Sequence, residues 1–188
     1  MHLAVTSLAL VLALVVPPGG SGSVPVDGAT LVLNEFLAGP ATDWDGSGAV
    51  STRDDEWVEI YNAGATVVDL SGYLLTDGDL VPRYAFAGTL APGGWRIVYG
   101  SASYAWEKAN GQPAYGLSLG NTGDTVMLWQ VAGAETVLVD SYAYRSHEAA
   151  ADRAVGRRAD GGDWALFDAL DPYTGTTPPL GTGCAPSP

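Results

Sequence analysis

The chain has 188 residues, of which 47% are hydrophobic and 15% charged, a composition that predicts one folded domain and argues against a disordered chain. Its formal net charge of −13, from 21 acidic and 8 basic residues, argues against direct binding to nucleic acid or to an anionic membrane surface, since phosphate groups require a basic footprint. With one cysteine and two histidines, the chain can form neither an internal disulfide nor a cysteine–histidine zinc cluster.

The first segment, residues 1–23, is typical of a secretory signal peptide. Leucine, valine and alanine dominate residues 3–16, and proline, glycine and serine follow at residues 17–23. The apolar run is shorter than the roughly 20 residues that a membrane span needs, so no membrane span is expected. We therefore expect a cleaved leader, a short linker over 24–30 and a secreted, extracellular or cell-surface protein. A short hydrophobic anchor or a buried N-terminal helix is the alternative.

Short apolar segments separated by turn residues follow the leader. Turn signals recur about every ten residues, which is typical of a β-sandwich or barrel and predicts an all-β fold of about 7–9 strands with little or no helix. The one stretch compatible with a helix is 148–155, which contains three consecutive alanines. Strands are expected at 31–37, 57–61, 66–70, 73–75, 84–86, 95–99, 124–129 and 136–140, with alternation continuing to 144.

The C-terminal segment, residues 171–188, is rich in threonine, proline and glycine and is expected to form a tail after a domain at 31–170. Cys184 lies in this tail, where it could pair with another molecule or stay a free thiol.

An acidic loop at residues 43–54 has the spacing of a calcium-binding loop of the EF-hand or dockerin type. Calcium takes six to eight oxygen ligands, and oxygen-bearing groups recur here at the first, third, fifth, seventh, ninth and twelfth positions. Gly48 at the sixth position is expected to make the sharp turn, and Val50 at the eighth to anchor the loop in the core. The alternative is an acidic turn without an ion. The candidate Ca²⁺ ligands are Asp43, Asp45, Ser47, the carbonyl of Ala49, Ser51 and Asp54.

Two glutamates, Glu35 and Glu59, fall in strands that would bring both carboxylates to one face if the strands pair. Two carboxylates can act as acid and base or hold a metal, so a small metal-dependent hydrolase that also uses Asp43 and Asp45 is one alternative function. A surface position, or a salt bridge to Arg157 or Arg96, is the structural alternative.

Exposed aromatic residues give a further alternative, because aromatic rings at loops can stack on sugars. Trp44, Tyr104 and Trp106 could serve a surface adhesion or glycan-binding domain in this way. His147 lies in a polar segment and is expected to be a solvent-exposed loop residue. The sequence does not specify whether the partner is a protein or a glycan.

A co-linear set of short motifs spans residues 31–179. The motifs are Leu33-Asn34-Glu35, residues 55–62 (DEWVEIYN), 68–73 (VDLSGY), 88–93 (GTLAPG) and 117–124 (LSLGNTGD), then Val139-Asp140-Ser141, and finally Gly156-Arg157 with Asp160-Gly161 and Trp164. Together they resemble the lamin tail domain, which also occurs in exported bacterial and archaeal proteins. The resemblance implies an Ig-like β-sandwich of two antiparallel sheets and a non-catalytic binding or structural module without a shared active site. It also implies core positions for Trp57 and Trp164 and turn positions for Gly72 and Gly93.

Overall fold

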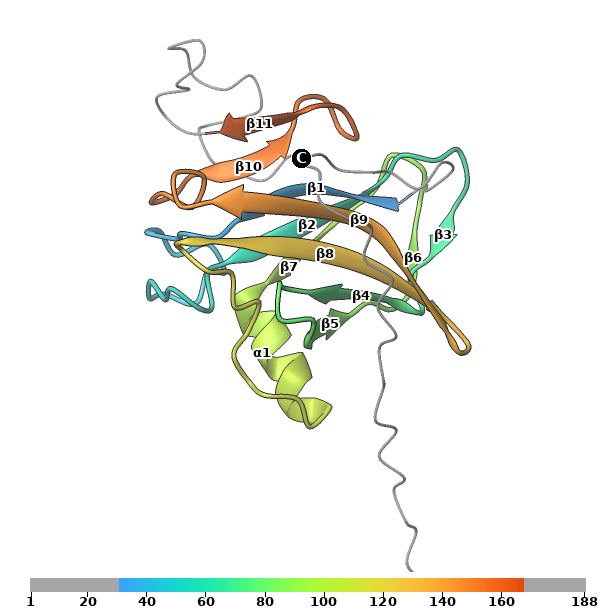
Figure 1. Cartoon of the computed structure of the whole chain (residues 1–188), viewed down its shortest axis with the longest axis horizontal. Coiled ribbons are helices and arrows are strands. Elements are labelled where there is room, and N and C mark those ends of the chain that lie inside the picture. The colour runs from blue at the N-terminus through green and yellow to red at the C-terminus, as the bar shows by residue number, and fades with distance from the viewer. Residues whose placement is uncertain (1–30, 168–188) are drawn as a thin grey trace, which may run out of the picture.

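The computed structural model describes residues 31–167 (Figure 1). The expected leader, linker and C-terminal tail, including Cys184, lie outside these residues. The described strands are β1 (Leu31–Leu37), β2 (Trp57–Asn62), β3 (Val68–Asp69), β4 (Tyr73–Thr76), β5 (Pro82–Ala85), β6 (Thr89–Leu90), β7 (Trp95–Tyr99), β8 (Gly123–Ala132), β9 (Glu135–Arg145), β10 (Ala154–Arg157) and β11 (Trp164–Phe167), and the helix is α1 (Gly100–Ala109).

Two antiparallel sheets make up the body of the molecule. One has five strands in the order β11-β10-β1-β2-β7, and the other has four in the order β5-β4-β8-β9. Strands β3 and β6 pair as a small separate ribbon. β9 contacts β1 across the interface between the sheets, and α1 lies against β5 and β7 at one side (Figure 1). The expected all-β, Ig-like sandwich of antiparallel sheets is therefore confirmed.

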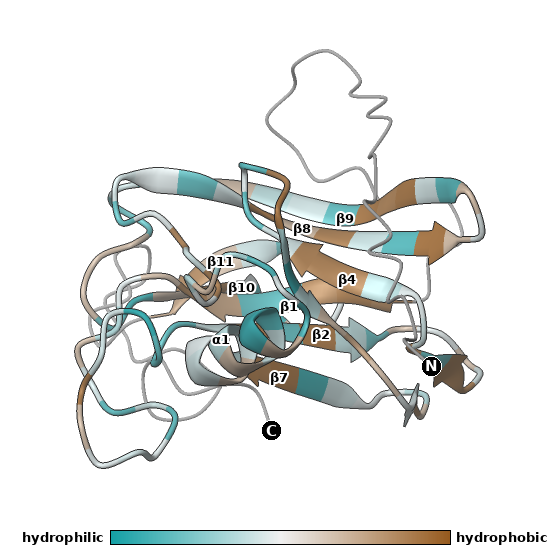
Figure 2. Ribbon diagram, turned by 90° about the horizontal axis from the view of Figure 1, so that it is seen from below, coloured by the Kyte–Doolittle hydropathy of each residue, from teal (hydrophilic) through white to brown (hydrophobic). Residues whose placement is uncertain are grey.

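The core forms because alternate side chains of each strand point to opposite faces of a sheet. Hydrophilic and hydrophobic residues are interspersed along β7, β8 and β9 (Figure 2). Val58, Ile60 and Leu128 are among the residues buried between the two sheets. Trp57 is also fully buried, but in a second cluster with Leu37 on the outer face of the five-stranded sheet.

Strand β1 contains a β-bulge that positions the polar residues discussed below. Its pairing with β2 shifts between Leu33 and Glu35, so that Asn34 is an extra residue with no partner on β2. A bulge of this kind reverses the alternation of side chains beyond it. Leu33 and Phe36 therefore both face the interior, while Glu35 lies opposite Glu59 on the outer face.

The helix lies elsewhere than the sequence predicts. Residues 148–155 form turns and the start of β10, and the turn is held in place by a hydrogen bond from the backbone of Asp152 to the carbonyl of Gly39 (2.8 Å). The helix α1 buries Gly100, Ser103 and Glu107. Its buried face is small or polar, so the hydrophobic periodicity that usually reveals a helix is missing.

The strand number also differs, because the described residues form eleven strands where seven to nine are expected. The additional strands are the short β6 and the closing hairpin of β10 and β11. Both predicted turn glycines, Gly72 and Gly93, have positive φ angles (91° and 69°). Trp164 is half-buried and packs against the main core cluster.

Candidate functional site

Leu33 is paired with Ile60 of β2, but the pairing of β1 with β10 covers only Glu35 to Leu37. A buried ion pair takes the hydrogen bonds of the Leu33 backbone. The Leu33 N–H donates to Oδ2 of Asp140 (3.0 Å), and the Leu33 carbonyl accepts from Nε of Arg157 (2.8 Å). Arg157 also donates through Nη2 to Asp140 (2.9 Å) and through Nη1 to the carbonyl of Gly162 (2.8 Å). Each charge is compensated and hydrogen-bonded, the condition under which buried charges are tolerated.

The bulge residue itself, Asn34, connects β1 to β2 and to the turn between β10 and β11. Its Nδ2 donates to Oε1 of Glu59 (2.7 Å) and to Oδ1 of Asp160 (3.0 Å), and its Oδ1 accepts from the N–H of Gly161 (3.0 Å). The polar residues of four separate sequence motifs thus meet at one point in space. Their contacts assign them a role in maintaining the bulge and the closing hairpin.

Glu35 and Glu59 lie opposite each other, as expected if their strands pair. Both side chains are buried, with exposed fractions of 1% and 0%. Burial raises the pKa of Glu59 from its ordinary value of 4.5 to about 7, although the hydrogen bond from Asn34 favours the charged form. Oε2 of Glu59 has no hydrogen-bond partner among the described residues.

The acidic loop between β1 and β2 closes on itself through carboxylate–backbone hydrogen bonds. Carboxylate oxygens of Asp43, Asp45 and Asp55 lie within 4.8 Å of one another. Both Asp43 (3.0 Å) and Asp45 (2.9 Å) accept the N–H of Ser47, whose Oγ donates to the carbonyl of Ala49 (3.2 Å). Four of the candidate ligands, Asp43, Asp45, Ser47 and Ala49, are therefore brought together in one turn.

The third carboxylate of the cluster belongs to Asp55 and not to Asp54. Asp54 forms a salt bridge with Arg53 (Nε to Oδ1, 2.7 Å) and accepts a hydrogen bond from Oγ of Ser51 (3.0 Å). Asp55 is fully buried and accepts three backbone N–H groups of the loop at 2.6 to 3.0 Å. The sequence places Asp54 and Asp55 side by side, which was the available signal for Asp55. The spacing of a calcium-binding loop, taken alone, favours Asp54.

The loop is anchored differently from the sequence prediction. Gly48 has a φ of 93°, as its place at the sharp turn requires. Val50, however, is 55% exposed, so its expected role as the apolar anchor is wrong. Trp44 takes that role, because its ring packs on Trp57 (centroids 6.1 Å apart) and its Nε1 donates to Asp152 (2.9 Å).

The loop also contacts the N-terminus of α1. The N–H of Gly100 donates to the carbonyl of Glu56 (2.7 Å), and a Cβ at Gly100 would lie 1.8 Å from the carbonyl oxygen of Arg53. A hydrogen bond with the side chain of Ser101 lowers the pKa of Asp45 below its ordinary value. Negative charge at a helix N-terminus is electrostatically favourable, so α1 favours the ionised form of Asp45.

Carboxylate, hydroxyl and carbonyl oxygens are the ligands that calcium prefers, and the loop contains no histidine or cysteine, the residues that would favour a softer metal. The cluster therefore fits a hard divalent cation. Asp43, Asp45 and Asp55 would supply the negative charge, and Ser47 and the carbonyl of Ala49 would supply neutral oxygens. The bound ion would neutralise three carboxylates held close together.

The sequence model of the Lamin Tail Domain matches residues 26–146. The chain belongs to the lamin tail domain family. Searches of curated proteins and of solved structures found no match. The two-sheet fold agrees with this family of Ig-like β-sandwich modules. Within residues 31–167 of this lamin tail domain, no helix is long and apolar enough to cross a membrane.

The residues of the alternative functions have structural contacts in this lamin tail domain. Asp43 and Asp45 cluster with Asp55 and not with the Glu35–Glu59 pair, so the two groups of carboxylates do not form one centre. The ring of Tyr104 lies under the guanidinium of Arg53 (4.0 Å to the centroid). Trp106 packs near Tyr84 (6.3 Å), and His147 is exposed in the turn after β9.

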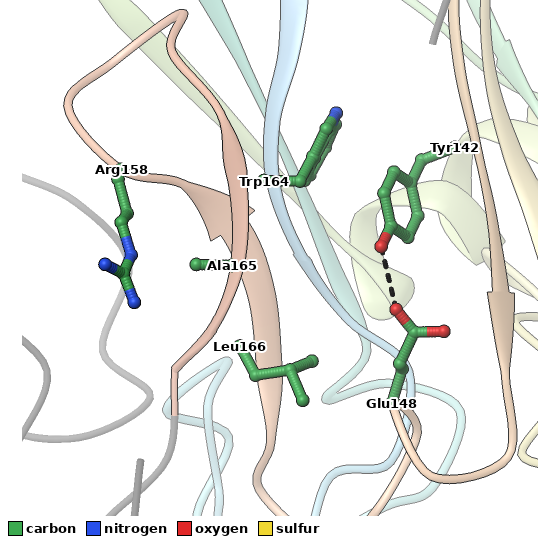
Figure 3. Close-up of a pocket in the computed structure, with 6 residues that line it drawn as sticks. All are labelled: Tyr142, Glu148, Arg158, Trp164, Ala165 and Leu166. Atoms are coloured by element: carbon green, nitrogen blue, oxygen red, sulfur yellow. Dashed lines mark hydrogen bonds between the residues drawn. The ribbon is translucent and has the colours of Figure 1, made fainter. Parts of the chain in front are cut away.

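A cavity of about 340 Å³ opens between β9 and β11 (Figure 3). Neither the buried glutamates nor the acidic loop lines it. The cavity could not be predicted from the sequence because residues from three separate segments form it, and Trp164 is the one lining residue that belongs to a family-like motif. The lining residues are Tyr142, Glu148, Arg158, Trp164, Ala165 and Leu166.

Proposed function

We propose that this lamin tail domain is an exported, non-enzymatic module with a structural or partner-binding role, and that its loop at 43–55 binds calcium. The observation that carries the non-enzymatic role is the cluster at the bulge of β1. The polar residues of the family-like motifs form hydrogen bonds to the backbone there and do not line the cavity. Residues used in this way stabilise a fold and are not available to a substrate.

The calcium proposal is supported by the three clustered carboxylates and by the turn at Gly48. The leader-like segment at 1–23 supports export, and extracellular calcium modules typically bind at ~10⁻⁴–10⁻³ M, which suits a protein outside the cell. The loop joins β1 to β2 and contacts α1, so a cation there would stabilise the connection between three elements.

Thermal melting of the full chain with and without millimolar calcium tests the loop. We expect calcium to raise the melting temperature because it removes repulsion among Asp43, Asp45 and Asp55. Asp45→Asn should abolish the gain. Asp163→Asn is the matched control, since Asp163 is exposed in the turn before β11, and it should keep the full gain. An equal response in both variants, or none in the unchanged protein, would reject calcium binding by the loop.

Export and partner binding are tested in the source cell. We expect the mature chain in the envelope or culture medium, with an N-terminus between residues 20 and 30 by mass spectrometry. A pull-down from both fractions, with and without calcium, tests the binding role. Recovery of the intact leader from the cytoplasm would contradict export.

A further inference from the structure

The cavity between β9 and β11 lies beside the outer edge of a sheet. β11 is the last strand of the five-stranded sheet, so one of its edges has no neighbouring strand among residues 31–167. Figure 3 shows Trp164 and Leu166 on the side of β11 that faces Tyr142 and Glu148, whereas Ala165 lies on the other side. A space lined by side chains from both faces of an edge strand borders the backbone of that strand.

The hydrogen-bond pattern of the hairpin shows which backbone groups of β11 point away from β10. The N–H of Arg158 donates to the carbonyl of Asp163 (2.7 Å), which identifies these residues as a hydrogen-bonded pair. Hydrogen-bonded and non-hydrogen-bonded pairs alternate in an antiparallel ladder. Ala165 therefore bonds to β10, and the N–H and C=O groups of Trp164 and Leu166 point away from it. Among residues 31–167, the N–H and C=O groups of Trp164 and Leu166 have no hydrogen-bond partner apart from the β10–β11 pairing.

The side chains around this edge are held in place. The Tyr142 hydroxyl donates to Oε1 of Glu148 (2.7 Å), and the other carboxylate oxygen of Glu148 accepts the N–H of Arg145 (2.8 Å). The ring of Trp164 lies 4.3 Å from the ring of Tyr142 and is covered by the guanidinium of Arg157 (4.5 Å). One wall is therefore aromatic with a fixed negative charge, and a partner can bind it without reordering these groups.

We propose that the edge of β11 that has no neighbouring strand among residues 31–167 receives an extended basic and apolar segment of a partner protein as an added strand. Main-chain hydrogen bonds to Trp164 and Leu166 supply affinity in this mode, and alternate side chains of the partner supply specificity. Its apolar side chains contact the Tyr142–Trp164 wall, and a lysine or arginine pairs with Glu148. The net charge of −13 attracts the same partner over longer distances. The inference rests on the proposed function because it assigns a site to the proposed partner-binding role.

The size of the cavity selects this occupant. A volume of 340 Å³ is near the lower end of the roughly 300–1,000 Å³ found for ligand sites, so it admits a short segment and not a folded surface. The edge strand β5 is covered by α1, whereas the edge strands β9 and β11 both border the cavity. Three of the lining residues, Trp164, Ala165 and Leu166, belong to β11 and one, Tyr142, to β9, which favours β11 as the edge that receives the segment. Arg158, exposed at the rim, can pair with an acidic residue on the outer face of the added strand.

Backbone amide exchange of the full chain with a short peptide of alternating lysine and valine tests the proposal. We expect saturable binding in which the amides of Trp164 and Leu166 gain protection and that of Ala165 does not change. Glu148→Lys should weaken binding by about tenfold or more, because it removes an ion pair and adds repulsion. Glu135→Lys, at the exposed start of β9, makes the same charge change away from the cavity and controls for net charge.

A peptide N-methylated at every residue separates strand addition from simple charge attraction, since it keeps its charge but loses the main-chain donors of both its edges. We expect it to lose binding. Equal binding of the methylated peptide, equal weakening by Glu135→Lys, protection of another edge strand, or no binding at millimolar peptide would each overturn the proposal. The calcium response of the same samples reports separately on the loop, so failure here is distinguishable from failure of the proposed function.

Discussion

Arg157 is the residue on which the closing hairpin depends most. Its guanidinium bonds to the carbonyls of Leu33 and Gly162 and to Asp140, and only 5% of its surface is exposed. Arg157→Met would leave the Asp140 carboxylate buried without its cation. Breaking a buried pair in this way typically costs ~3–5 kcal/mol of unfolding free energy.

Urea denaturation measures this loss as a lower midpoint. Arg158→Gln is the matched control because Arg158 is the exposed neighbour of Arg157, and its substitution should change the midpoint little. Equal midpoints for the two variants would show that the ion pair at the bulge contributes no stability.

Glu59 makes the stability of the domain depend on pH. Below pH 4.5 its carboxyl is protonated in both the folded and the unfolded chain. Between 4.5 and about 7 the unfolded chain releases the proton first, so the free energy of unfolding falls as pH rises, and the fall ends above the folded pKa. Glu56, whose pKa burial raises to about 9, extends the decline to higher pH.

Substitution by the neutral amide should remove the part due to Glu59. Glu59→Gln keeps an oxygen for Asn34, and we expect it to raise the free energy of unfolding at about pH 8 by on the order of 2 kcal/mol and to flatten the decline between 4.5 and 7. Chemical denaturation at a series of pH values provides the measurement. Glu135→Gln, on an exposed carboxylate, should leave the curve unchanged, and identical curves for all three proteins would refute the assignment.

Among the elements, α1 and the acidic loop should behave as one unit. Gly100 approaches the carbonyl of Arg53 so closely that a Cβ would lie 1.8 Å from the oxygen. Gly100→Ala should therefore separate the start of α1 from the loop and lower both the melting temperature and its increase with calcium. Ala105→Ser changes an exposed position of the same helix and serves as the control. A normal calcium response in Gly100→Ala would show that the loop does not need the helix.

The contact between α1 and the acidic loop also explains why the ligand set of the loop was predicted only in part. The spacing of Asp43 and Asp45 is a local property, and the structure brings these residues together as expected. The choice of Asp55 over Asp54 depends on α1 and on the salt bridge from Arg53, which are tertiary contacts that spacing does not contain. The loop anchor was missed for a similar reason, because Trp44 finds its partners only in the folded protein.

For the whole molecule, the family match is shorter than the folded unit. It ends at residue 146, before β10 and β11, which complete the five-stranded sheet. A fragment ending at residue 146 would lose the buried side chains of Val155 and Leu166 and the cation for Asp140. We expect this fragment to melt without a cooperative transition, as measured by circular dichroism. Adding residues 147–188 as a separate peptide should restore part of the transition, and a cooperative melt of the fragment alone would contradict the prediction.

Most of the sandwich was predictable from sequence because short apolar segments recur between turn residues at a spacing of about ten residues. Two features were not. The helix α1 buries Ser103 and Glu107, so its inner face does not read as apolar. The bulge at Asn34 is invisible because residues 31–37 are buried on both faces, and a strand with two buried faces has no alternation to interrupt.

That bulge gives the first strand a single acceptable alignment. Slippage of β1 by one position would turn Glu35 toward the apolar interior. Slippage by two would keep the faces correct but would move the Leu33 amide and carbonyl away from Asp140 and Arg157, leaving a buried ion pair with unmet hydrogen bonds. Both shifts in register would therefore raise the free energy of the folded state. The bulge thus favours a single pairing of β1 with its neighbouring strands while the chain folds.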